Sequence, residues 1–125
     1  WKGAYKKIIT ITLKKLALSG SNFNDLIAII GPCIDKRSYE VRKDFFNKFI
    51  KQEKSNKKFF NIKNNKLYFS LNNYITDEFL KLGVKNIEII KKDTYLLNNN
   101  FFSARRSIKN KLYDYGRNIS VIMIN

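Results

Sequence analysis

Histidine is absent from this chain of 125 residues, and cysteine, proline, tryptophan and methionine occur once each. Without histidine, the chain cannot build the His-rich three-ligand site that is typical of catalytic zinc. Its one cysteine allows no disulfide within the chain, so we expect a reducing compartment, the cytoplasm. No apolar run approaches the roughly 18 residues of a membrane span, which predicts a soluble protein with no membrane partner.

Acidic residues are also few, since 10 Asp and Glu stand against 25 Lys and Arg, a net charge of +15. Such an excess is typical of proteins that bind polyanions, nucleic acid among them. Most of this charge is lysine, however, in a composition rich in Asn and Ile, which is typical of an AT-rich genome. No arginine-rich stripe or aromatic RNA-binding motif accompanies it. We therefore do not expect nucleic acid as the partner, and a basic nucleic-acid-binding module stays as the alternative.

Apolar spacing in the first half of the chain predicts two helices around a strand. Residues 4–18 carry apolar side chains at helical spacing and end at a Ser-Gly pair. Residues 26–30 form a continuous apolar run before Gly31-Pro32, which indicates a buried strand and a turn. Ser38 is a candidate cap for a helix that runs to about Lys51.

The second half continues the alternation. The Lys- and Asn-rich residues 51–66 predict a surface loop with a short strand near Phe59–Ile62. A helix begins near Ser70 and ends at Gly83. Further strands are expected at 86–90, 101–105 and 119–124, with a turn at 98–100. The fold class is therefore α/β or α+β, with a mixed β-sheet packed with helices, in a single partial domain over residues 1–125.

Three segments carry a family resemblance. They are Trp1-Lys2-Gly3-Ala4, then Gly31-Pro32-Cys33-Ile34 with Tyr39-Glu40-Val41, then Phe101-Phe102-Ser103-Ala104-Arg105-Arg106 with Tyr115-Gly116-Arg117. In this order and spacing the chain resembles the laccase-domain family, also called multicopper polyphenol oxidase-like proteins. Trp1 to Ala4 look like the tail of the family's His-Ala-Gly-Trp-Arg-Gly segment.

The resemblance implies the C-terminal part of a laccase-domain, cysteine-hydrolase-like fold. Bacterial members are understood as purine nucleoside phosphorylases, which are transferases that also have adenosine deaminase and methylthioadenosine phosphorylase activity. The resemblance thus implies an enzyme whose partners are a purine nucleoside and phosphate. A non-functional gene remnant is the other alternative for a chain of this kind.

The family's metal ligands, two His and one Cys, belong to segments that would lie upstream of Trp1. We therefore expect zinc (or copper) in the intact enzyme, no metal bound by this chain alone, and catalytic residues in a missing N-terminal half. Cys33 belongs to the Gly-Pro-Cys-Ile turn and is not the family's ligand cysteine. The expectation for Cys33 is a small buried side chain near a strand end.

Candidate substrate- and phosphate-binding residues are Arg105, Arg106, Arg117, Lys2 and Tyr95. Arginine suits phosphate because its planar guanidinium offers paired donors. On a strand, the adjacent Arg105 and Arg106 would point to opposite faces, one toward the site and one toward a structural partner.

Two aromatic residues and one acid complete the set of candidates. Trp1 and Tyr95 are candidates to stack on a purine ring. Glu40 is expected at a helix start, in a structural role, and is a candidate ion-pair partner for the arginines.

Four positions depart from the family pattern. Lys2 replaces an Arg, Asp93 stands where many members have Cys, Ala104 replaces a Tyr and Tyr115 replaces a Thr. The change at Lys2 would turn a two-pronged anion contact into a single point charge.

Overall fold

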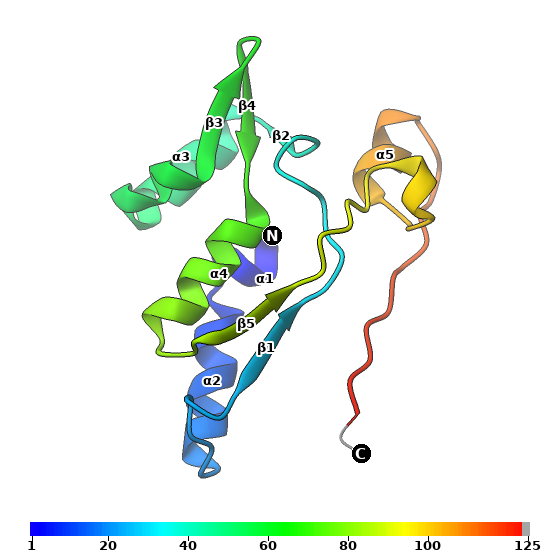
Figure 1. Ribbon diagram of the computed structural model, residues 1–125. Helices are drawn as coiled ribbons and strands as arrows, with labels where there is room; N and C mark the ends of the chain where they lie inside the picture. Colours follow the sequence, from blue (N-terminus) through cyan, green and yellow to red (C-terminus); the bar gives the residue numbers. More distant parts are fainter. Residues whose placement is uncertain (124–125) are drawn as a thin grey trace.

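The computed structural model describes residues 1–123, which form two small sheets with helices packed against them (Figure 1). Strands β1 (Ile27–Ile30) and β5 (Asn86–Ile89) make a parallel pair. Strands β2 (Glu40–Val41), β3 (Phe60–Lys63) and β4 (Lys66–Phe69) make an antiparallel sheet in the order β2-β4-β3. The α/β class predicted from the sequence is confirmed.

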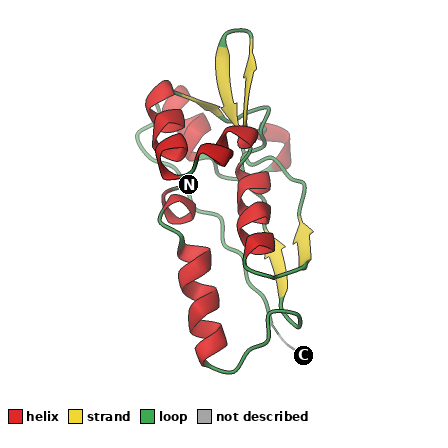
Figure 2. Cartoon of the chain, turned by 90° about the vertical axis from the view of Figure 1, so that its left-hand side faces the viewer, coloured by secondary structure: helices red, strands yellow, loops and turns green. Residues whose placement is uncertain are grey.

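Helix α4 (Leu71–Lys81) joins the two sheets, because it follows β4 directly and contacts both strands of the parallel pair. Gly83, with φ +91°, ends the helix in the left-handed conformation expected of a glycine there. Helix α2 (Ile8–Leu18) lies alongside α4 and projects from the body of the molecule (Figure 2). None of the described helices is long and apolar enough to cross a membrane.

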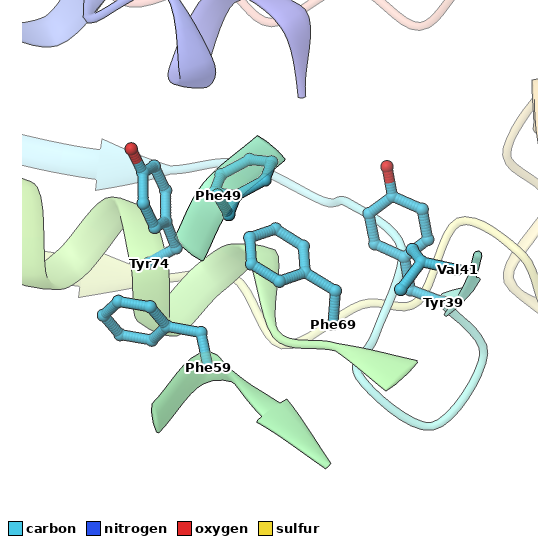
Figure 3. Close-up of a cluster of buried hydrophobic side chains, with 6 residues drawn as sticks. All are labelled: Tyr39, Val41, Phe49, Phe59, Phe69 and Tyr74. Carbon is cyan, nitrogen blue, oxygen red and sulfur yellow. The ribbon is translucent and has the colours of Figure 1, made fainter. Parts of the chain in front are cut away.

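The core is mostly aromatic. Phe49 of α3 (Lys43–Gln52) is fully buried between Phe69 and Tyr74, with ring centroids 4.9 and 5.1 Å away (Figure 3). Edge-to-face and tilted ring pairs at these distances add to the gain from burying apolar area. The 3₁₀ helix η1 (Lys54–Phe59) closes one side of this core with Phe59.

A partly buried ion pair links the start of the chain to α4. Lys7, at φ 58°, separates α1 (Lys2–Tyr5) from α2, so the single helix predicted over residues 4–18 is broken. Its Nζ lies 2.7 Å from Oε2 of the buried Glu78. Burial lowers the pKa of Lys7, but the hydrogen bond and charge of Glu78 together with the neighbouring Tyr74 phenol more than offset this effect, and the pKa is raised.

Several predicted boundaries were wrong. Ser38 caps no helix, because β2 intervenes before α3 begins at Lys43. Residues 51–66 are not one loop, since they hold η1 and β3 and only the Asn64-Asn65 pair forms the hairpin turn. The short strand expected near Phe59–Ile62 is present as β3.

The C-terminal region differs most from the expectation. Residues 101–105 are not a strand, because Ser103 begins helix α5 (Ala104–Lys109) and its Oγ accepts a hydrogen bond from the Arg106 amide. A short 3₁₀ helix, η2 (Leu97–Asn99), forms the expected turn. Of the predicted strand 119–124, the structure describes residues 119–123, which adopt no regular secondary structure, and Ile124 lies outside the described residues.

Candidate functional site

A pocket of about 670 Å³ lies between the loop after β1, the start of α3 and the start of α5. The loop from β1 to β2 supplies Cys33 and Tyr39, and the start of α3 supplies Arg42. The loop after β5 and the start of α5 form another wall. The remaining side is the segment 115–118. The three segments that carry the family resemblance are separate in the sequence, yet all contribute residues to this pocket.

Arg105 faces this pocket over an aromatic ring. Its Cζ lies 5.4 Å from the ring centroid of the buried Tyr39. Burial raises the pKa of the Tyr39 phenol, although the Arg105 charge opposes that rise. The phenol therefore stays neutral near pH 7 and supports the guanidinium through the face of its ring.

Arg117 lies on the same pocket, positioned by its own segment. Its Cζ is 4.1 Å from the ring centroid of Tyr115, and its Nη1 donates a 2.6 Å hydrogen bond to the Tyr115 carbonyl oxygen. Asn118 fixes the segment by exchanging two hydrogen bonds, of 2.8 and 3.0 Å, with the backbone of Phe102. Gly116 packs directly against the Phe102 ring, and a Cβ atom at this position would collide with it.

The charge around the pocket is strongly positive. Arg42, Arg105 and Arg117 line it, and Asp44 is the one carboxylate among its lining residues. Three guanidinium groups with partly apolar walls favour an anion that also has a flat or apolar part. Arg42 and Asp44 were missed from the sequence, because nothing in the spacing of α3 distinguishes its first residues from an ordinary exposed helix start.

Arg106 has a different role from its neighbour. Its guanidinium donates hydrogen bonds of 3.1, 2.8 and 2.6 Å to the carbonyl oxygens of Thr94, Tyr95 and Phe101. These bonds tie α5 to the loop after β5. Arg105 lines the pocket and Arg106 does not, and the two side chains are separated by the geometry of helix α5 rather than by strand alternation.

The loops that carry the pocket are joined by a buried carboxylate. Asp93 accepts hydrogen bonds from the Ser38 hydroxyl at 2.6 Å, the Tyr95 amide at 2.8 Å and the Asp35 amide at 3.2 Å. It therefore connects the β1–β2 loop with the β5–α5 loop.

Three sequence candidates lie away from the pocket lining. Lys2 is exposed on α1. The Tyr95 hydroxyl accepts a 3.1 Å hydrogen bond from Lys109. Glu40 is in strand β2 rather than at a helix start, and its partner is Lys66 at 2.9 Å, not an arginine. Trp1, by contrast, lines the pocket and packs edge-on against Phe45.

The residues described here do not fit a metal ion. Among residues 1–123 no group of three His, Cys, Asp or Glu side chains is placed to hold one. Cys33 donates a 2.7 Å hydrogen bond to Oδ1 of Asn72. Burial raises the pKa of its thiol to about 11, which disfavours the thiolate that a metal requires.

A second hollow, of about 660 Å³, lies beside the β3–β4 hairpin. Its floor is apolar, and its charged lining is Lys43, Lys57 and Lys66 with Glu40. Because Glu40 already pairs with Lys66 and no arginine is present, this hollow lacks the paired donors that distinguish the first pocket. The candidate site is therefore the arginine-lined pocket.

Comparison with known proteins identifies the family to which the chain belongs. The whole chain, residues 1–125, matches the family described as multi-copper polyphenol oxidoreductase laccase, and the chain belongs to this family. Over 109 residues it is 37% identical to a purine nucleoside phosphorylase of Rickettsia conorii and 36% identical to one of Rickettsia prowazekii. These alignments cover 86% of this chain but 45% of each relative, so the chain spans about half the length of the curated relatives it matches.

Proposed function

We propose that this chain is the substrate-binding C-terminal part of a purine nucleoside phosphorylase. The observation that carries the proposal is the convergence of Arg42, Arg105 and Arg117 on one pocket that also holds aromatic side chains. The names of the two Rickettsia relatives support it, since both are called purine nucleoside phosphorylases.

The pocket chemistry suits the two substrates of that reaction. Phosphorolysis joins inorganic phosphate to the anomeric carbon of the ribose, breaks the bond to the base, and releases free purine and ribose 1-phosphate. Phosphate must be held beside the sugar with its charge balanced, which guanidinium groups do through paired hydrogen bonds. Trp1 and Phe45 offer ring surfaces for a purine at the same pocket.

The other functional groups lie in the part of the laccase domain that this chain does not cover. This part supplies the catalytic residues and the zinc (or copper) centre, as the resemblance to the laccase-domain family implies. Adenosine deamination and phosphorolysis of methylthioadenosine belong to the same assembled site. The isolated 125-residue chain is therefore inactive.

A chimera tests the proposal. The part of the Rickettsia conorii relative that this chain does not cover is fused ahead of it, and phosphate-dependent release of hypoxanthine from inosine is measured. We expect activity, and at least a tenfold rise in the KM for phosphate for Arg105→Ala and Arg117→Ala, since a charge-assisted hydrogen bond contributes roughly 1.5–3 kcal/mol.

Arg37→Ala is the matched control, because Arg37 is exposed, pairs with Asp35 and does not line the pocket. The proposal is wrong if the chimera folds but releases no base. The assignment of the pocket is wrong if Arg37→Ala and Arg105→Ala change the KM equally.

A further inference from the structure

The two strands of the parallel pair carry different residues on their uncovered face. In β1, Ile27 is 64% exposed and Ile29 is 46% exposed. Their direct neighbours in β5 are Asn86 and Glu88. The same face is therefore apolar along β1 and polar along β5.

The opposite face is apolar on both strands. Ala28 and Ile30 of β1 lie beside Ile87 and Ile89 of β5, on the side where α4 contacts the sheet. Since successive residues of a strand point to opposite faces, β5 alternates between covered apolar and exposed polar residues. Strand β1, in contrast, carries apolar residues on both faces.

These two patterns distinguish an edge strand from an interior one. A strand of a parallel sheet that is buried on both faces is continuously apolar, whereas alternation marks a face in contact with water. Within the described residues, neither strand has a partner on its other side. The alternating sequence of β5 suits an edge strand, whereas β1 leaves two isoleucines and an unpaired backbone edge exposed.

We propose, resting on the proposed function above, that β1 is the attachment site for the part of the laccase domain that this chain does not cover. That part adds a strand to the open edge of β1 and covers Ile27 and Ile29. Strand β5 then stays at the edge of the enlarged sheet.

Three observations favour this occupant. The curated relatives are more than twice as long as the matched segment, which is 45% of their length. A second copy is disfavoured because each copy carries a net charge of +15. The chain's own segment 119–123 approaches at Ser120, beside Gly31 just beyond the end of β1, but forms no strand there.

Co-expression with the uncovered part of the Rickettsia conorii relative tests the attachment, so that each part can fold against the other. The tagged chain is purified, the co-purified partner is quantified, and hydrogen exchange of the Ile27–Ile30 amides is followed with and without it. We expect a one-to-one complex and at least tenfold slower exchange in β1 when the partner is bound.

Two exposed isoleucines provide matched variants. Ile27→Lys should lower the recovery of the partner at least tenfold, whereas Ile62→Lys should not, because Ile62 is 73% exposed on β3, away from this sheet. Thermal melts of both variants alone check that each still folds. Equal recovery with both variants, or slower exchange in β5 alone, would overturn the proposal.

The other occupants give different results. A dimer of the chain alone with protected β1 amides would identify a second copy instead. Protection of β1 in the monomeric chain, lost on Val121→Lys, would identify the C-terminal segment. A stable complex that shows no phosphorolysis contradicts the proposed function and leaves the attachment intact. An active complex with unprotected β1 amides contradicts the attachment at β1 and leaves the proposed function intact.

Discussion

Replacing Arg106 with alanine should destabilise the fold, whereas replacing its neighbour Arg105 should weaken substrate binding and leave the fold stable. Arg106 donates three hydrogen bonds to backbone carbonyl oxygens that connect α5 to the preceding loop. Arg105 stands over the Tyr39 ring and otherwise faces the pocket. Adjacent residues of the same type therefore have separable functions.

The magnitudes follow from these contacts. Hydrogen bonds from a charged donor contribute roughly 1.5–3 kcal/mol each when buried and about 1 kcal/mol when water can replace them. Arg106 is half-buried, so its three bonds amount to about 3 kcal/mol. The exposed cation–π contact of Arg105 contributes about 0.5–1 kcal/mol.

Urea unfolding of the chain and of both alanine variants measures the difference directly. We expect the free energy of unfolding to fall by about 3 kcal/mol for Arg106→Ala and by less than about 1 kcal/mol for Arg105→Ala. Arg106→Lys should lie between them, since an ammonium group cannot reach all three carbonyl oxygens. If Arg105→Ala is the more destabilised variant, the assignment of the two arginines is wrong.

Three further predictions concern the core, the pH response and one turn. Phe49→Ala should lower the free energy of unfolding by about 3–5 kcal/mol, because Phe49 is fully buried. Ile62→Ala, at an exposed site, should change it by less than about 0.5 kcal/mol. Equal effects of the two substitutions in urea unfolding would contradict the placement of Phe49 in the core. The pKa of Cys33 is raised from 9.0 to about 11 and that of Lys7 is raised above 10.5, so the folded state holds both protons more tightly than the unfolded state. The contribution of Cys33 to stability is therefore full below pH 9 and is lost as the pH rises toward 11, and that of Lys7 is lost at still higher pH. A urea midpoint that rises between pH 9 and 11 in pH-stepped unfolding would contradict this prediction. Gly83→Ala should cost about 1 kcal/mol, since φ is +91° and nothing nearer than 4.0 Å obstructs the added methyl group; an unchanged melting temperature would show that the turn tolerates a side chain.

The regular parts of the fold were predictable because local pattern and packing agree there. The strand at residues 26–30, the strand at 86–90 and the helix from Ser70 are confirmed to within a residue or two. The first has a continuous apolar run that ends at a glycine, the second alternates between polar and apolar residues, and the helix has apolar residues at helical spacing between a serine and a glycine.

The errors lie where a single cap or bend decided the structure. Phe101 and Phe102 have high strand propensity, but Ser103 accepts a hydrogen bond from the Arg106 amide and starts a helix instead. The break at Lys7 could not be seen in the sequence, because the apolar spacing continues across it; its ion-pair partner, Glu78, lies 71 residues further along the chain.

The candidate site was predictable in part. Arg105 and Arg117 were identified because they belong to a recognisable motif, and both line the pocket. Arg42 joins them only because β2 and the start of α3 fold back over the loop after β1. Lys2 and Tyr95 lie in or near the same motifs, yet the chain directs both away from the pocket lining.

The stoichiometry of phosphate consumption by the chimera tests most directly whether the assembled pocket carries out phosphorolysis. Inosine is supplied with limiting phosphate, and the loss of phosphate, the release of hypoxanthine and the formation of ribose 1-phosphate are measured together. We expect one phosphate consumed and one ribose 1-phosphate formed for each base released, with no release in the absence of phosphate. Base release that continues without phosphate and yields free ribose would contradict it.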